Sequence, residues 1–247
     1  MTTIDAKGIY YKTLNQHIRE LVQKGEKEFN LVNVNGQRYI GDGIKGDIKI
    51  VINGVPGNDL GAFMNGPTIT VNSNAQDAVG NTMGSGKIVI KGHAGDVLGY
   101  GMRGGKVFIK GDVGYRVGIH MKGFMDKNPV MICGGTAGDF FGEYMAGGIL
   151  MLLGLNRNGN DSRPIAGDYL GTGMHGGVIY IRGEVNEKRT GAEVGIKELD
   201  SEDKEILEKH LTEYCRDLDI DINQVLNKNF IKLIPVSSRP YGNLYAY

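Results

Sequence analysis

Leu60-Gly61-Ala62-Phe63-Met64-Asn65-Gly66 decides the fold of this chain, because the same cassette recurs along the sequence. Its pattern is an apolar residue, glycine, two variable positions, methionine, one variable position and, in most copies, a second glycine. The other copies contain Val79-Gly80 with Met83, Leu98-Gly99 with Met102, Val117-Gly118 with Met121, Phe141-Gly142 with Met145, and Leu170-Gly171 with Met174; Ile40 to Gly46 is the same cassette with Ile44 in place of methionine. A unit that recurs every 20 to 50 residues indicates a solenoid or another repeat architecture.

The spacing of the cassettes is regular. Successive methionines are 19, 19, 19, 24 and 29 residues apart, and Ile44 precedes Met64 by 20 residues. The two longer spacings contain insertions at 124–128 and 156–165, where we expect loops. Glycine supplies 40 of the 247 residues, about twice its ordinary share of roughly 7%, and a glycine corner permits a positive φ or a tight turn.

Short alternating apolar runs separate the cassettes, and each run ends at a small residue. The alternating pairs are Ile50/Ile52, Ile69/Val71, Ile88/Ile90, Val107/Ile109, Met131/Cys133, Leu150/Leu152 and Ile179/Ile181. Alternation with a period of two residues predicts β-strands. On this interpretation Cys133 is a small buried apolar residue of the strand interior.

A unit of 19 residues holds about three short strands and three turns, so successive units must stack strand on strand at about 4.8 Å per unit. The sequence therefore predicts a mainly β fold, a right-handed, single-stranded parallel β-helix of about seven coils and roughly 34 Å in length. The methionines form an internal ladder, since their period is that of the coil. The terminal coils expose unpaired edges and need caps.

The two ends of the chain are poorer in glycine and predict short helical flanks. Leu14, Ile18, Leu21 and Val22 have helical spacing and predict a helix over about 14–24. A second amphipathic stripe contains Ile206, Leu207, His210, Leu211, Tyr214 and Leu218, with Asp200 or Ser201 as its N-cap. Residues 230–235 predict a short extended segment. We therefore divide the chain into an N-terminal arm and helix (1–30), a β-helix (31–195), and a C-terminal helix and tail (196–247), with the helices as candidate caps.

Composition excludes several classes of protein. Lys plus Arg and Asp plus Glu balance at 28 each, whereas binding to nucleic acid or an anionic membrane requires a basic excess. No apolar run approaches the roughly 18 residues of a membrane helix, and the first residues lack the pattern of a signal peptide. Cys133 and Cys215 match no metal or disulfide spacing. We expect a cytoplasmic protein without nucleic acid or membrane among its partners.

The pattern Gly-x-Gly-x-x-Gly occurs at Gly41/Gly43/Gly46, Gly99/Gly101/Gly104 and Gly171/Gly173/Gly176. A dinucleotide site needs this pattern once, between a strand and a helix whose N-terminus faces the pyrophosphate. Each copy here leads into another strand and shares the repeat register. We interpret all three copies as structural corners.

Two sets of polar residues also share the repeat register. One column contains Asn58, Asp77, Asp96, Asp139 and Asp168, with Tyr115 in the remaining coil. It could form a calcium ladder or a polysaccharide lyase face, but we favour Asx turns, in which each side chain bonds its own backbone. The other set contains His120 and His175, near Arg103 and Lys122 in register. A metal would need a third ligand there, so we interpret the histidines as surface or partner-contact residues.

The cassettes resemble those of a known family. Residues 57–64, 94–102 and 171–177 are similar to the GXGXG domain, the β-helix at the C-terminal end of the glutamate synthase large subunit. Residues 230–235 are similar to the end of that subunit. The resemblance spans nearly the whole chain and is strongest to the separately encoded, archaeal-type form of the domain.

The resemblance implies a structural role. Glutamate synthase makes two glutamates from glutamine and 2-oxoglutarate, using an amidotransferase part with an N-terminal cysteine and a synthase part that carries FMN and an iron–sulfur cluster. This sequence does not match the catalytic or cofactor-binding motifs of either part, so we expect no catalytic, cofactor-binding or metal-binding residue in it. The implied partners are the synthase subunit with FMN and the iron–sulfur cluster, and also the glutamine amidotransferase subunit.

Two alternatives stay open. Formylmethanofuran dehydrogenase contains a related β-helix as one of its subunits, and the chain could be the equivalent scaffold of such an oxidoreductase. It could also be a β-helix enzyme acting on carbohydrate. Such enzymes expose aromatic and acidic residues along a groove, whereas this chain has no Trp and few aromatic residues in register.

Overall fold

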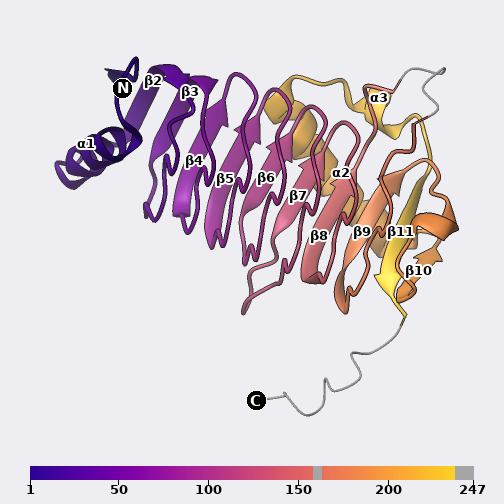
Figure 1. Cartoon of the computed structure of the whole chain (residues 1–247). Helices are drawn as coiled ribbons and strands as arrows, with labels where there is room; N and C mark the ends of the chain where they lie inside the picture. The colour runs from indigo at the N-terminus through magenta and orange to yellow at the C-terminus, as the bar shows by residue number, and fades with distance from the viewer. Residues whose placement is uncertain (158–162, 237–247) are drawn as a thin grey trace, which may run out of the picture.

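The computed structural model describes residues 1–157 and 163–236, so parts of the second predicted insertion and of the predicted tail lie outside the described residues. One sheet of eleven strands runs the length of the described chain (Figure 1). Its strands are β1 (Thr2–Asp5), β2 (Glu28–Asn35), β3 (Lys49–Val55), β4 (Asn65–Val71), β5 (Ser85–Ile90), β6 (Lys106–Ile109), β7 (Val130–Cys133), β8 (Ala146–Leu152), β9 (Gly176–Arg182), β10 (Val194–Lys197) and β11 (Phe230–Pro235). The helices are α1 (Tyr11–Gln23), α2 (Ser201–Leu218) and α3 (Ile222–Leu226), with a 3₁₀ turn at Glu187–Arg189.

The strands β1 to β9 pair in chain order and in parallel, as a solenoid requires. Each connection between successive strands from β2 to β9 contains one cassette. The six cassette methionines, Met64, Met83, Met102, Met121, Met145 and Met174, are all at most 1% exposed and belong to one apolar core. The inward residues of the alternating strands, Cys133 included, line the same core. The predicted parallel β-helix and its internal methionine ladder are confirmed.

Each copy of the repeat has three left-handed backbone positions, spaced two residues apart, and the first of them directly precedes the cassette. Around the second cassette they are Asp59, Gly61 and Phe63, with φ values of 60°, 66° and 56°. Only the middle position is glycine in all seven copies. A Cβ on Gly61 would lie 2.7 Å from Ile88 Cδ1 and 2.9 Å from Met64 Sδ, whereas Phe63 is 58% exposed. The core therefore requires glycine at the middle position, while the outer positions tolerate side chains.

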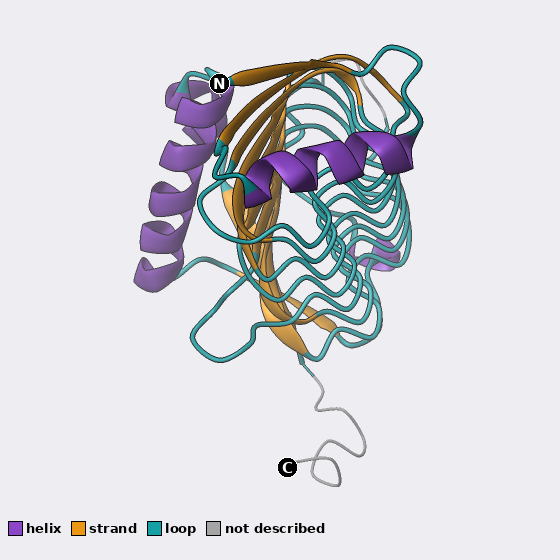
Figure 2. Cartoon of the chain, turned by 90° about the vertical axis from the view of Figure 1, so that its left-hand side faces the viewer, coloured by secondary structure: helices purple, strands orange, loops and turns teal. Residues whose placement is uncertain are grey.

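The helix α1 closes the N-terminal end of the solenoid, as predicted for a cap. It lies across the mouth of the first coils (Figure 2). Leu14 and Ile18 are each 1% exposed and pack into the solenoid core. The predicted domain boundaries at 30/31 and 195/196 fall inside β2 and β10, so both ends of the chain contribute strands to the common sheet.

The prediction that the second helix caps the end of the solenoid is wrong, as the position of α2 shows (Figure 2). This helix begins after the N-cap Asp200 and buries the predicted stripe except for the half-buried Ile206. It lies along the outer face of the sheet rather than across its end (Figure 2). Its Leu211 and Tyr214 pack against outward residues of β5 to β9: Val89, Phe108, Ile132, Met151 and Tyr180. The C-terminal end of the sheet is extended instead by β11 and β10, which pair antiparallel; β11 spans the predicted extended segment.

Polar contacts join α2 to the sheet. The ammonium of Lys87 on β5 lies 2.8 Å from Glu213 Oε1 and 2.6 Å from Asp217 Oδ2, and Lys106 on β6 also pairs with Glu213. The buried hydroxyl of Tyr214 donates to the carbonyl of Ile109 over 3.1 Å. These pairs are partly shielded from solvent, so they position α2 along the sheet as well as adding stability.

Replacing Gly99 by valine should destabilise the fold. Gly99 has a φ of 65°, and a Cβ there would lie 2.5 Å from Met131 Cε. We expect a loss of at least about 1–3 kcal/mol in the free energy of unfolding, measured by denaturant titration. The matched control is Gly43→Asn, at a position that has a φ of 63° and nothing within 4 Å of an added Cβ, and it should cost less than about 1 kcal/mol. Equal losses for the two variants would contradict the core constraint.

Acid should loosen α2. Burial lowers the pKa of His210 to about 4, helped by the charges of Lys106 and Lys209 and opposed by that of Glu213. Burial alone would raise the pKa of Glu213, but hydrogen bonds and charges from Lys106 and Lys87 outweigh it and lower the pKa to about 2. Both groups bind fewer protons in the folded state, so stability falls as pH drops, from about 6.5 for His210 and from about 4.5 for Glu213.

Melting temperatures measured between pH 7.5 and pH 3.5 test this expectation. His210→Gln should flatten the decline between pH 6.5 and pH 4, because it removes the buried imidazole. His17→Gln, which alters an exposed histidine on α1, should leave the decline unchanged. A wild-type melting temperature that is constant down to pH 4 would contradict the assignment.

Candidate functional site

The carboxylate column joins neighbouring coils. Asp77 Oδ1 accepts from the backbone N–H of Asp96 over 2.9 Å, and Asp96 Oδ1 accepts from the N–H of Tyr115 over 2.9 Å. Asp139 Oδ1 likewise accepts from the N–H of Asp168 over 2.8 Å. The Asx-turn interpretation was therefore wrong for Asp77, Asp96 and Asp139, because these three side chains bond the backbone of the next coil rather than their own turn. The role in these coils is nevertheless structural.

A parallel ladder runs through a neighbouring position of the coils. The side chains of Asn74, His93 and Asp112 accept in turn from the N–H groups of His93, Asp112 and Thr136, over 2.7 to 2.9 Å. These acceptors are spaced one per coil rather than converging on one point, and each is already bonded to an N–H group of the next coil. Among the described residues, no group of three or more His, Cys, Asp or Glu side chains could hold a metal ion.

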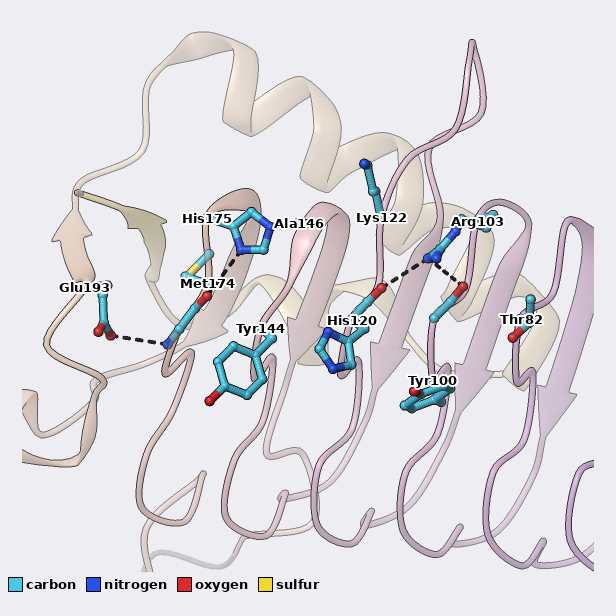
Figure 3. A pocket seen from close by; sticks show the side chains of 12 residues that line it. Thr82, Tyr100, Arg103, His120, Lys122, Tyr144, Ala146, Met174, His175 and Glu193 are labelled. Atoms are coloured by element: carbon cyan, nitrogen blue, oxygen red, sulfur yellow. Dashed lines mark hydrogen bonds between the residues drawn. The ribbon is translucent and has the colours of Figure 1, made fainter. Parts of the chain in front are cut away.

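A groove of about 650 Å³ lies on the cassette side of the solenoid (Figure 3), and no residue of α2 belongs to its lining. We call it the cassette groove, and its lining is Thr82, Tyr100, Gly101, Arg103, His120, Lys122, Tyr144, Ala146, Gly173, Met174, His175 and Glu193. It follows the solenoid axis over successive coils (Figure 3). Its side chains form two rows. The aromatic row comes from positions one or two residues before the cassette methionines, and the basic row comes from the position directly after them.

The aromatic row contains Tyr100, His120 and Tyr144. The rings of His120 and Tyr144 stack with centroids 5.4 Å apart and an interplanar angle of 11°. Tyr100 meets His120 edge to face, with centroids 5.8 Å apart. The two tyrosines are 42% and 47% exposed, so this row presents ring surface to solvent.

The basic row contains Arg103, Lys122 and His175. The guanidinium of Arg103 is held in place because Nη1 donates to the carbonyls of Gly101, over 2.7 Å, and His120, over 3.1 Å. The acid of the groove is Glu193, whose Oε2 accepts from the N–H of Gly173 at one end (Figure 3). No ion pair to Arg103 or Lys122 occurs within the described part of the chain. The groove is therefore more basic than the balanced chain as a whole.

In two of the three Gly-x-Gly-x-x-Gly copies, the second glycine lies in the lining of this groove. Gly101 and Gly173 occupy the outward left-handed position that His120 and Tyr144 occupy in neighbouring coils. Side chains from neighbouring positions lie over both glycines, Arg103 over Gly101 and Tyr144 over Gly173. All three copies lead into strands, as expected, and serve as corners of the coil.

The structure brings together the four residues that register placed near one another, His120, His175, Arg103 and Lys122. Sequence reasoning missed Tyr100, Tyr144 and Glu193. It also underestimated the alignment of aromatic residues along the solenoid. Tyr144 occupies the same cassette position as His120, so its place beside His120 could have been predicted from the repeat. Glu193 follows the last cassette, and no repeat position indicated that it would line the groove.

The repeated coil, the inward glycines and the uncovered cassette face define a glycine-cornered parallel β-helix. The sequence matches the family model of the GXGXG motif over residues 12–236, and the chain belongs to this family. An uncharacterized protein of Methanocaldococcus jannaschii is 51% identical over 249 residues, which cover 98% of this chain and 95% of the relative. None of the helices in the described ranges is both long and apolar enough to span a membrane.

Removing one hydrogen bond of the carboxylate column should lower the stability of the fold, and the stability should not depend on a metal ion. Asp96→Ala leaves the Tyr115 N–H without its acceptor and should lower the free energy of unfolding by about 1 kcal/mol. Asp96→Asn keeps an acceptor oxygen and should stay near wild type. Melting curves in the presence of added calcium and in EDTA should coincide; a melting temperature raised by calcium would favour the calcium ladder instead.

Proposed function

We propose that this chain is a structural subunit of a glutamate synthase complex in the cytoplasm. Its partners are the synthase subunit that carries FMN and an iron–sulfur cluster, and also the glutamine amidotransferase subunit. Membership of the GXGXG family supports the assignment to glutamate synthase. On this proposal the chain contributes no catalytic residue and holds the catalytic subunits at a fixed separation.

The observation that carries the scaffold role is the contrast between the two long faces of the solenoid. The outer sheet face of β5 to β9 is covered by α2 within the chain itself. The cassette face has no such cover among the described helices and presents exposed rings, including Phe63, Tyr144 and Tyr169 at 47–58% exposure. Exposed aromatic residues on a rigid surface are typical of protein interfaces.

The equivalent scaffold of formylmethanofuran dehydrogenase would use the same rigid face, and only the identity of the partner separates the two assignments. A carbohydrate-active enzyme is favoured by one observation, the aromatic row of the cassette groove. Glycoside hydrolysis commonly needs two carboxyl groups that flank the scissile bond. Among the described residues, Glu193 is the single carboxylate in the groove lining, which disfavours that reaction.

Affinity capture from native extract, under gentle low-salt conditions, tests the proposal. The tagged chain should recover the flavin-bearing synthase subunit, and the isolated chain should show neither glutaminase nor glutamate-forming activity. Ammonia release needs an activated nucleophile with a stabilised oxyanion, and 2-oxoglutarate reduction needs a redox cofactor. Recovery of the other components of formylmethanofuran dehydrogenase would favour the alternative scaffold. A yellow, flavin-loaded preparation of the isolated chain would overturn the non-catalytic role.

A further inference from the structure

The cassette groove is long and open. Its lining follows Thr82, Tyr100, His120, Tyr144, Gly173 and Glu193 through successive turns of the chain. Five steps at about 4.8 Å give a length of roughly 24 Å, the span of about seven residues of extended polypeptide. Small-molecule sites usually bury about 70–90% of their ligand. A shallow groove with tyrosines more than 40% exposed is better suited to a polypeptide.

The two rows of the groove differ in chemistry. One wall presents the rings of Tyr100, His120 and Tyr144, and the opposite wall presents Arg103 and Lys122 (Figure 3). An extended polypeptide directs successive side chains to opposite sides. A segment lying along the groove would therefore direct one set of side chains to the basic wall and the other set to the aromatic wall.

A hairpin beside the groove supplies a second, independent observation. It begins just after Lys122, and Phe124 and Lys127 exchange two backbone hydrogen bonds of 3.0 Å each. At its tip Phe124 is 56% exposed and Met125 is 87% exposed. Two large apolar side chains held out in solvent beside a basic groove indicate contact with a macromolecule.

We propose that the cassette groove and this hairpin form a docking surface for an extended acidic segment of a partner polypeptide. Carboxylates at alternate positions of the segment meet Arg103 and Lys122, and aromatic side chains between them pack on the ring row. The apolar hairpin tip contacts the body of the same partner. The inference deepens the proposed scaffold function by specifying the chemistry of the partner, and it rests on that function for the existence of the partner.

Fluorescence anisotropy with the full chain at low salt tests the groove directly. The probe is a labelled seven-residue peptide of alternating glutamate and tyrosine, and the comparison probe replaces glutamate with lysine. We expect the acidic peptide to bind at least tenfold more tightly than the basic one, and the affinity to fall as salt is raised. Arg103→Glu combined with Lys122→Glu should weaken binding at least tenfold, and Tyr144→Ala should also weaken it.

The matched control is Lys91→Glu combined with Lys110→Glu. These two exposed lysines are also 19 residues apart and lie outside the groove, so the pair makes the same change of net charge. It should leave peptide affinity unchanged, with circular dichroism showing that all variants are folded. Equal loss in the control and groove variants would overturn the proposal. Tighter binding of single-stranded oligothymidylate than of the acidic peptide would overturn it as well.

Capture from native extract separates this inference from the proposed function. The hairpin variant Phe124→Ser with Met125→Ser and the groove variant Arg103→Glu with Lys122→Glu should both lose a partner that wild type recovers. If both retain it, the docking surface is wrong and the scaffold function stands. If wild type recovers no synthase subunit but the acidic peptide still selects the groove, the docking surface stands and the glutamate synthase assignment fails.

Discussion

The rest of the structure depends on the close contact between the middle glycine of each cassette and the core side chain of a following strand. A Cβ added to Gly61 would lie 2.7 Å from Ile88 Cδ1, and one on Gly118 would lie 2.5 Å from Leu150 Cδ1. The same relation holds for Gly41, Gly80, Gly99, Gly142 and Gly171, where the nearest side-chain atom would be 2.5 to 3.2 Å away. Glycine at this position lets core side chains pack against the backbone of the preceding coil and keeps the stacking tight.

This constraint leaves the neighbouring positions free to vary. The backbone is also left-handed two residues before and two residues after the middle glycine. Side chains at these two positions point outward, so they can be Asp59 and Phe63 in one coil and Phe140 and Tyr144 in another. The repeat therefore forms the solenoid and also places outward side chains in columns. Each column has one residue per coil, and the residue type varies from coil to coil. The cassette groove consists of such columns, interrupted where Gly101 and Gly173 carry no side chain.

The position of α2 shows how the two halves of the sheet differ. One outward column runs through Asn30, Val51, Thr70, Val89, Phe108, Ile132, Met151 and Tyr180 in register. It is largely polar up to Thr70 and apolar from Val89 onward. The helix covers the apolar part, while Asn30, Asn53 and Asn72 form a side-chain hydrogen-bonded ladder on the part that it leaves open. Burial of apolar area, rather than the need to close the end of the solenoid, therefore determines where α2 lies.

The sequence by itself determined the coil, because every feature of the coil repeats locally. The cassette, the alternating strands, the methionine ladder, the presence of α1 and the extended segment of β11 all follow from periods shorter than 30 residues, although α1 begins three residues before the predicted start. Only the tertiary structure decided which surfaces meet. The burial of α2 against β5 and β6 joins residues more than 100 positions apart, as between Lys106 and Glu213. Glu193 likewise joins the cassette groove from beyond the last methionine of the repeat. Such contacts depend on the three-dimensional path of the chain, which a one-dimensional period does not contain.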